Sequence, residues 1–217
     1  MAEELPLFPL NTVLFPGMPL PLHIFEPRYR EMIGFCSETE KPFGVVLIRE
    51  GSEVGEPATP FDVGTLARIV GLDRMQDGRM NIVTVGTRRF RLVSYSAEKK
   101  SYMVGDVEPL PDDPDAPSRS AGLVDEVASL ARRYVAMVQA ALEQDLVPLQ
   151  LPDSAEEMSY VVGGSLRVHN PERQRLLETT STAQRLELEK AILAREIGTL
   201  DGFLQQRKGD LGPFSRN

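Results

Sequence analysis

Residues 5–22 read LPLFPLNTVLFPGMPLPL, a run of apolar residues punctuated by prolines. Residues 5–10 predict an edge strand, because a proline cannot donate a hydrogen bond to a neighbouring strand. Pro16-Gly17 indicates a turn, and the alternating apolar residues of 20–25 predict a second strand. Residues 27–35 then predict a short helix with a proline in its first turn.

The β pattern continues through the first half of the chain. Asp77-Gly78 lies between two long apolar segments and predicts a hairpin turn. Gly86 interrupts the second of these segments and predicts a bulge or a bend. The further strands are expected at residues 43–49, 63–72, 80–93 and 102–107.

Residues 109–117, PLPDDPDAP, form a linker rich in proline and aspartate, and the periodicity changes after it. Apolar residues now recur every three or four positions, which predicts one stripe along a long helix. The stripe consists of Leu123, Val127, Leu130, Tyr134, Val138 and Leu142.

Three more helices are predicted by their first residues. Ser154 with Glu157, and Ser181 with Gln184, have the spacing of a capping box, and Asn170-Pro171 has a cap followed by proline. We therefore expect an α+β protein with a β-rich domain over residues 1–111 and an all-helical subdomain of about four helices over 118–209.

The composition excludes several classes of protein. The formal net charge is −8, and both halves of the chain are acidic, which disfavours a nucleic-acid binder. Cys36 is the only cysteine, so no disulfide can form within the chain. The first residues lack the features of a secretory signal, and no apolar run is long enough to span a membrane. A cytoplasmic location is expected.

Three sequence blocks resemble the N-terminal substrate-binding domain of ATP-dependent Lon proteases. The first covers residues 5–32, the second is VGTLARI at 63–69, and the third is VGTRRFRL at 85–92. The continuation at 23–32 is similar to small stand-alone bacterial members of the family and to the Lon-like domain of cereblon. The resemblance implies a PUA-like pseudo-barrel followed by a helical bundle, and a role in selecting protein substrates.

The catalytic parts of Lon are not expected in this sequence. No Gly-Lys pair exists to build an ATP-binding loop, and no serine has the context of the Lon serine–lysine dyad. His23 and His169 are the only histidines, so a metal site is not expected. Cys36 has no base beside it in sequence and is interpreted as a packing residue. We therefore expect no enzyme activity and no cofactor.

A polypeptide-binding groove is one hypothesis for the proline-rich loop and the residues after it. Adaptable methionine and aromatic side chains could line an apolar groove, with arginines at its rim. The alternative is a purely structural turn whose Phe15 and Met18 pack inward. The candidate residues for polypeptide binding are Phe15, Met18, Phe25, Arg28 and Tyr29.

An RNA-binding role is the alternative hypothesis. On a strand, Arg89 and Arg91 share one face and Arg88 shares the other with Phe90, and some PUA-like folds bind RNA. The simpler interpretation is a solvated face that pairs with acidic residues. Our main prediction is a non-catalytic module that binds unfolded or misfolded polypeptides, as an adaptor in protein quality control that works with a protease or chaperone.

Overall fold

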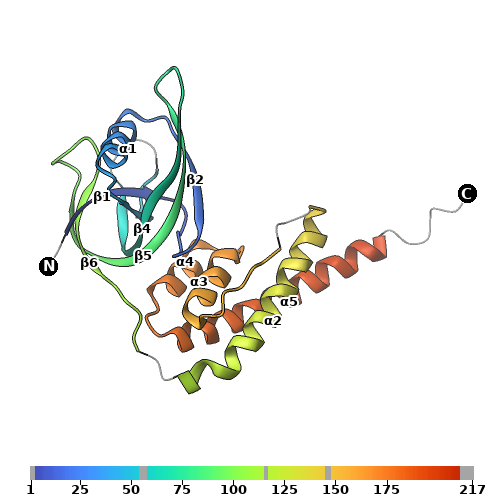
Figure 1. Ribbon diagram of the computed structural model, residues 1–217. Coiled ribbons are helices and arrows are strands. Elements are labelled where there is room, and N and C mark those ends of the chain that lie inside the picture. Colours follow the sequence, from blue (N-terminus) through green and yellow to red (C-terminus); the bar gives the residue numbers. More distant parts are fainter. Residues whose placement is uncertain (1–2, 54–57, 115–116, 145–147, 211–217) are drawn as a thin grey trace, which may run out of the picture. The chain divides into compact units, whose positions relative to one another are not determined.

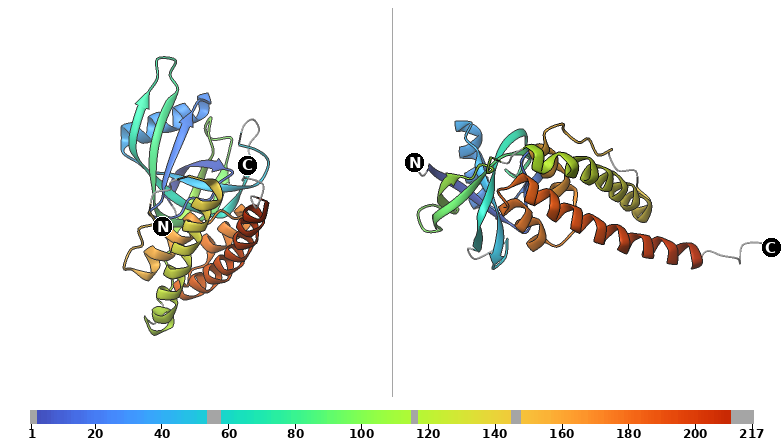
Figure 2. Two further views of the ribbon diagram at one scale, coloured as in Figure 1. Left: turned by 90° about the vertical axis from the view of Figure 1, so that its right-hand side faces the viewer. Right: turned by 90° about the horizontal axis from the view of Figure 1, so that it is seen from below.

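The computed structural model describes residues 3–53, 58–114, 117–144 and 148–210, which fall into two compact units (Figures 1 and 2). The first unit combines Met1–Asp113 with Arg167–Thr180, and the second combines Pro114–Leu166 with Ser181–Asn217. The expected helical subdomain, 118–209, is thus divided. Residues 167–180 pack on the strands of the first unit.

The described strands of the first unit form one mixed sheet, which confirms the α+β class. The order is β2-β5-β4-β3-β1-β6, and β5 pairs again with β6, so β5, β4, β3, β1 and β6 close into a barrel. Closure is possible because β5 is long and pairs with β2 through its first half and with β6 through its second. The strands are β1 Glu3–Leu10, β2 Pro19–Ile24, β3 Phe43–Glu50, β4 Thr59–Arg74, β5 Met80–Ser96 and β6 Val104–Pro109.

The turns follow the local sequence signals. Gly17 has φ +77° and Met18 N–H donates to the Phe15 carbonyl at 3.1 Å, which forms the predicted proline-glycine turn. Gly78 has φ +82°, so the predicted hairpin between β4 and β5 is confirmed. The register of β4 with β5 shifts beside Gly86, where the Gly86 N–H donates to the Met18 carbonyl at 3.0 Å. A Cβ at Gly86 would lie 2.3 Å from the Phe15 carbonyl oxygen.

Two helices complete the first unit. Helix α1, Pro27–Thr39, buries Met32, Ile33 and Cys36 in the main core cluster. Helix α4, Asn170–Glu178, contacts the strands and the loop after β1 through polar groups. Gln174 donates to the Val63 carbonyl at 3.0 Å, and Asn170 donates to the Asn11 carbonyl at 2.7 Å.

The second unit consists of α2, Pro117–Leu142, α3, Ala155–Ser165, and α5, Thr182–Asp210. Helices α2 and α5 run side by side in the same direction, since Glu126 pairs with Lys190 at 2.9 Å and Arg133 with Asp201 at 2.8 Å (Figures 1 and 2). Ser154 and Ser181 accept from the backbone N–H groups of Glu157 and Gln184, so both predicted caps are confirmed. Within the described ranges, no helix is long and apolar enough to cross a membrane.

Candidate functional site

Three strand segments form the outer part of the sheet. They are β2, residues 68–74 of β4 and residues 80–85 of β5, which we call the distal parts of these two strands. One side of these strands packs into the core, where Ile24, Met80 and Ile82 are almost fully buried beside α1. The other side is exposed to solvent. We name this exposed side the distal face. It consists of Pro19, Pro21, His23, Arg68, Val70, Asp73, Asn81, Val83 and Val85.

The middle of the distal face is apolar. Pro21 lies opposite Val83 in the ladder between β2 and β5, and Val83 lies opposite Gly71 in the ladder between β5 and β4. The register shift after Ile69 is a bulge that includes Val70, so Val70 is exposed beside this row. Val70 is 48% exposed and Val83 is 44% exposed. An antiparallel sheet with one solvated side normally carries polar residues there, so this row is unusual.

Polar residues border the apolar row on both sides. His23 lies opposite Asn81, and its Nδ1 is 2.7 Å from the Asn81 Oδ1. The Phe25 ring lies beside the His23 ring, with 6.1 Å between centroids, and Phe25 is 51% exposed. Asp73 lies opposite Asn81, at the same end of the apolar row as His23. Arg68 lies at the other end of the row, opposite Val85. The face therefore has an apolar centre and an exposed aromatic ring at one end. The charges of Arg68 and Asp73 cancel each other.

The predicted loop residues do not line one surface. Phe15 is 1% exposed, and the Arg173 guanidinium lies over its ring at 5.8 Å. Met18 is half-buried and packs against the main core. Phe25, in contrast, is an exposed apolar side chain. Phe15 and Met18 pack inward because the turn folds back against Gly86.

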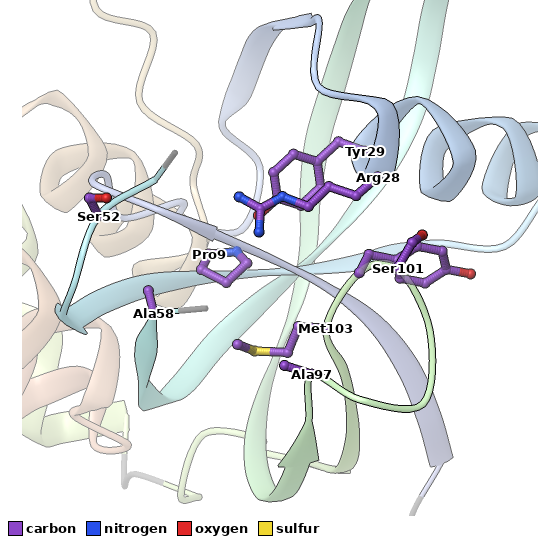
Figure 3. A pocket seen from close by; sticks show the side chains of 9 residues that line it. Pro9, Arg28, Tyr29, Ser52, Ala58, Ala97, Ser101 and Met103 are labelled. Atoms are coloured by element: carbon purple, nitrogen blue, oxygen red, sulfur yellow. The ribbon is translucent and has the colours of Figure 1, made fainter. Parts of the chain in front are cut away.

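Arg28 and Tyr29 line a small cavity between the start of α1, the end of β1 and the β5–β6 loop (Figure 3). The Arg28 guanidinium lies 4.7 Å over the Tyr29 ring and pairs with Glu26 at 2.9 Å. Tyr29 is buried and stacks on Phe8, and burial raises the pKa of its hydroxyl, while Arg28 opposes this rise. The cavity measures about 30 Å³. It has room for about two water molecules.

The three arginines proposed for RNA have different environments. Arg88 and Arg91 are exposed, but the Arg89 side chain is 1% exposed. Arg89 forms a salt bridge with Asp112 and donates to the carbonyls of Leu177 and Thr179 at 2.6 and 2.8 Å. Its guanidinium is therefore held inside the first unit by the residues that end α4, and it cannot meet a phosphate at the surface.

Cys36 and the potential metal ligands are further candidate reactive groups among the described residues. Cys36 is buried, and burial raises the pKa of its thiol to about 11, so the reactive thiolate is disfavoured at neutral pH. In the described part of the chain, no group of three His, Cys, Asp or Glu residues is placed to hold a metal ion.

Val70 and Val83 were missed by reasoning from the sequence. A signal was present, because Ile82 and Val83 are both apolar and a strand with one solvated side would alternate. Such a run is also expected for a strand buried on both sides, so the sequence could not say that the outer side is open.

Comparison with known proteins agrees with this fold. A sequence model described as the ATP-dependent protease La (LON) substrate-binding domain matches residues 4–195. The structure of a Lon N-terminal domain protein from Xanthomonas campestris is 30% identical, with a TM-score of 0.60, and the match covers 85% of this chain and 95% of that one. The N-terminal domain of a Mycobacterium avium complex Lon protease has the same fold, at 17% identity and a TM-score of 0.63, with coverage of 88% and 98%.

A full-length relative shows how much of a Lon protease the chain represents. Lon protease 2 of Syntrophobacter fumaroxidans is 29% identical over 213 residues, which is 97% of this chain and 26% of the relative. The chain thus spans about a quarter of the length of that protease. The chain belongs to the LON substrate-binding domain family.

Proposed function

We propose that this chain is a non-catalytic module that binds unfolded or misfolded polypeptides through its distal face. The observation that carries the proposal is the apolar row of Pro21, Val83 and Val70 on the solvent side of an antiparallel sheet. Exposed apolar patches on soluble proteins mark interaction surfaces more often than isolated exposed residues do. The family match supports a polypeptide as the ligand.

The size of the apolar row predicts weak and reversible binding. Val70, Val83 and Phe25 are each about half exposed. Covering the exposed half of such a side chain contributes roughly 1 kcal/mol. Because few side chains contribute, the loss of one should weaken binding measurably. Binding of this kind suits a protein that holds many different sequences for a short time.

The charge of the distal face favours a polypeptide over RNA. The apolar row carries no charge, and Arg68 and Asp73 at its two ends have opposite signs. A nucleic-acid site instead needs a cluster of basic residues that neutralises several phosphates. The whole chain is acidic, with a net charge of −8.

The wider role follows from the same proposal. The family model that matches residues 4–195 is that of a substrate-binding domain, and the chain spans about a quarter of the length of Lon protease 2 of Syntrophobacter fumaroxidans. We propose that the module acts in the cytoplasm as an adaptor, and that it presents bound polypeptides to a protease or chaperone without a cofactor of its own.

The test compares two exposed valines on one strand. Val83→Ser removes an apolar group from the distal face, and Val93→Ser makes the same change where Val93 is 57% exposed elsewhere on β5. Fluorescence anisotropy would follow binding of labelled, reduced and carboxymethylated α-lactalbumin, which stays unfolded. We expect Val83→Ser to weaken binding about fivefold and Val93→Ser to change it less than twofold.

Two results would contradict the proposal. Equal effects of the two substitutions would show that the distal face is not the binding surface, and absence of binding by the unmodified protein would remove the function itself. Displacement of the probe by an RNA homopolymer at low salt, lost in an Arg88→Ser, Arg91→Ser variant, would favour the RNA alternative instead.

A further inference from the structure

The prolines of β2 remove backbone donors from the open edge of the distal sheet. The Gly86 N–H donates to the Met18 carbonyl at 3.0 Å, and the Gly86 carbonyl accepts from the Gly17 N–H at 2.9 Å, so Gly17 and Met18 together oppose Gly86 and the Met18 carbonyl points toward β5. Backbone groups alternate in direction along an antiparallel strand, so Leu20, Leu22 and Ile24 direct theirs toward β5 as Met18 directs its carbonyl. The backbone groups of the residues between them point to the open edge.

Pro19, Pro21 and His23 are those outward residues. Proline has no N–H, so His23 supplies the only outward N–H from these three positions. The described residues include no strand on this side of β2, which is the last strand in the sheet order. An added peptide strand would therefore find carbonyls on this edge but lack the donors that its own carbonyls need.

The opposite edge of the distal sheet is also unsuited to strand addition. The pairing of β4 with β3 ends at Ala67, and the following part of β4 contains the bulge at Val70. Arg68, Asp73 and Arg74 add charges along the same segment. Bulges and charged residues are the features by which natural sheets prevent pairing at an edge.

We infer that the distal face binds polypeptides through their apolar side chains alone and does not add them to the sheet as a strand. This inference rests on the proposed function and deepens it, because it names the class of ligand. The occupant is a polypeptide segment with neighbouring apolar side chains, whatever the conformation or hydrogen bonding of its main chain. The uncharged centre of the face, with one positive and one negative residue at its ends, complements such a segment.

N-methylation of the ligand tests the inference. The probe is a labelled 12-residue peptide of leucine, alanine and serine, together with a version that is N-methylated at alternate residues. Strand addition requires the N–H groups that N-methylation removes, whereas side-chain contact does not. We expect the two peptides to bind with dissociation constants within about threefold of each other, and Val83→Ser to weaken both.

A second variant restores the missing donors. Pro19→Val with Pro21→Val keeps the face apolar and adds two outward N–H groups to β2. We expect this variant to self-associate in size-exclusion chromatography with light scattering, or to bind the unmethylated peptide at least tenfold more tightly than the methylated one.

The outcomes separate the inference from the proposed function. Binding of the unmethylated peptide with a tenfold or greater loss on N-methylation would overturn the inference and leave the function standing. Absence of binding by either peptide or by the unfolded protein probe would overturn both. If the variant with Pro19→Val and Pro21→Val remains monomeric and binds both peptides alike, this result would also contradict the role assigned to Pro19 and Pro21.

Discussion

At the residue scale, Arg89 joins three segments of the first unit. Its guanidinium contacts Asp112 and two carbonyls at the end of α4, and its own carbonyl accepts from the Leu110 N–H at 3.1 Å. Nearby, Thr180 donates to the Asp113 carboxylate at 2.6 Å. The two places where the chain leaves the first unit, after Asp113 and after Thr180, are therefore held side by side.

Arg89→Met should destabilise the first unit by about 3–5 kcal/mol, because it leaves the Asp112 carboxylate buried without its ion partner. Urea unfolding followed by circular dichroism would measure the change. Arg91→Met is the matched control, and we expect an effect within about 0.5 kcal/mol because Arg91 is exposed. The double variant Arg89→Met, Asp112→Leu should recover much of the loss, and failure to recover any would refute the ion-pair explanation.

Glu189 is a second buried charged residue, in the helical unit. It is fully buried on α5, and neither carboxylate oxygen has a hydrogen-bond partner. Burial raises the pKa of Glu189 well above its ordinary value, although Arg185 one turn earlier opposes the rise. Arg185 itself donates to the Ser159 hydroxyl at 2.8 Å and lies over the Tyr160 ring. The carboxyl is therefore held in its neutral form over a wider pH range than in the unfolded chain.

This raised pKa predicts how stability depends on pH. The folded unit retains the Glu189 proton at a pH where the unfolded chain has lost it, so stability falls as pH rises from the ordinary Glu range toward the raised pKa. The slope is at most about 1.4 kcal/mol per pH unit. Glu189→Gln should remove this slope in thermal unfolding between pH 4 and 8, while Glu187→Gln on the exposed side of α5 should keep it. An unchanged slope in Glu189→Gln would assign the pH dependence to other groups.

At the element scale, the barrel closes around glycines that make room for Phe90. A Cβ at Gly64 of β4 would lie 2.6 Å from the Phe90 ring and 2.5 Å from the Val45 carbonyl oxygen. A Cβ at Gly44 of β3 would also lie 2.7 Å from the same ring. The Phe90 ring thus fills the space that side chains at these two positions would take.

Gly64→Ala should cost about 1–3 kcal/mol, because the added methyl overpacks the barrel. Gly71→Ala on the same strand is the control, since its Cβ would meet Val83 at an ordinary 3.7 Å. Chemical unfolding of both variants would measure the difference. Equal stabilities of the two variants would mean that the barrel can relax around the extra methyl group.

The elements could largely be predicted from the sequence, because their signals are local. The turn at Gly17, the hairpin at Gly78 and the caps at Ser154 and Ser181 each depend on neighbouring residues. The packing of α4 could not be predicted in this way. Its cap and proline predict a helix, but its place on the strands depends on contacts such as Gln174 with Val63, which are more than 100 residues apart in sequence.

The candidate site shows the same limit. Phe25 was predicted and is exposed, whereas Phe15 and Tyr29 have the same apolar character and are buried. Alternation along a strand tells which residues share a side, but not what covers that side. For that reason the sequence did not distinguish the buried Arg89 from its exposed neighbours Arg88 and Arg91. It also did not distinguish the exposed Val83 from a core residue.

At the scale of the whole molecule, the central claim is that the distal face binds unfolded polypeptides. The main core cluster and the distal face both belong to the first unit. Polypeptide binding is therefore expected on the strands and not on the α2–α5 pair. We expect that a bound polypeptide perturbs one side of the outer sheet and leaves the rest of the barrel unchanged.

The most direct measurement is a map of amide chemical shifts of the ¹⁵N-labelled protein with and without reduced, carboxymethylated α-lactalbumin. The account predicts shifts in β2, in residues 68–74 of β4 and in residues 80–85 of β5, with no change around Val93 and Tyr95. Shifts confined to the helical unit or to the surroundings of Arg88 and Arg91 would contradict it.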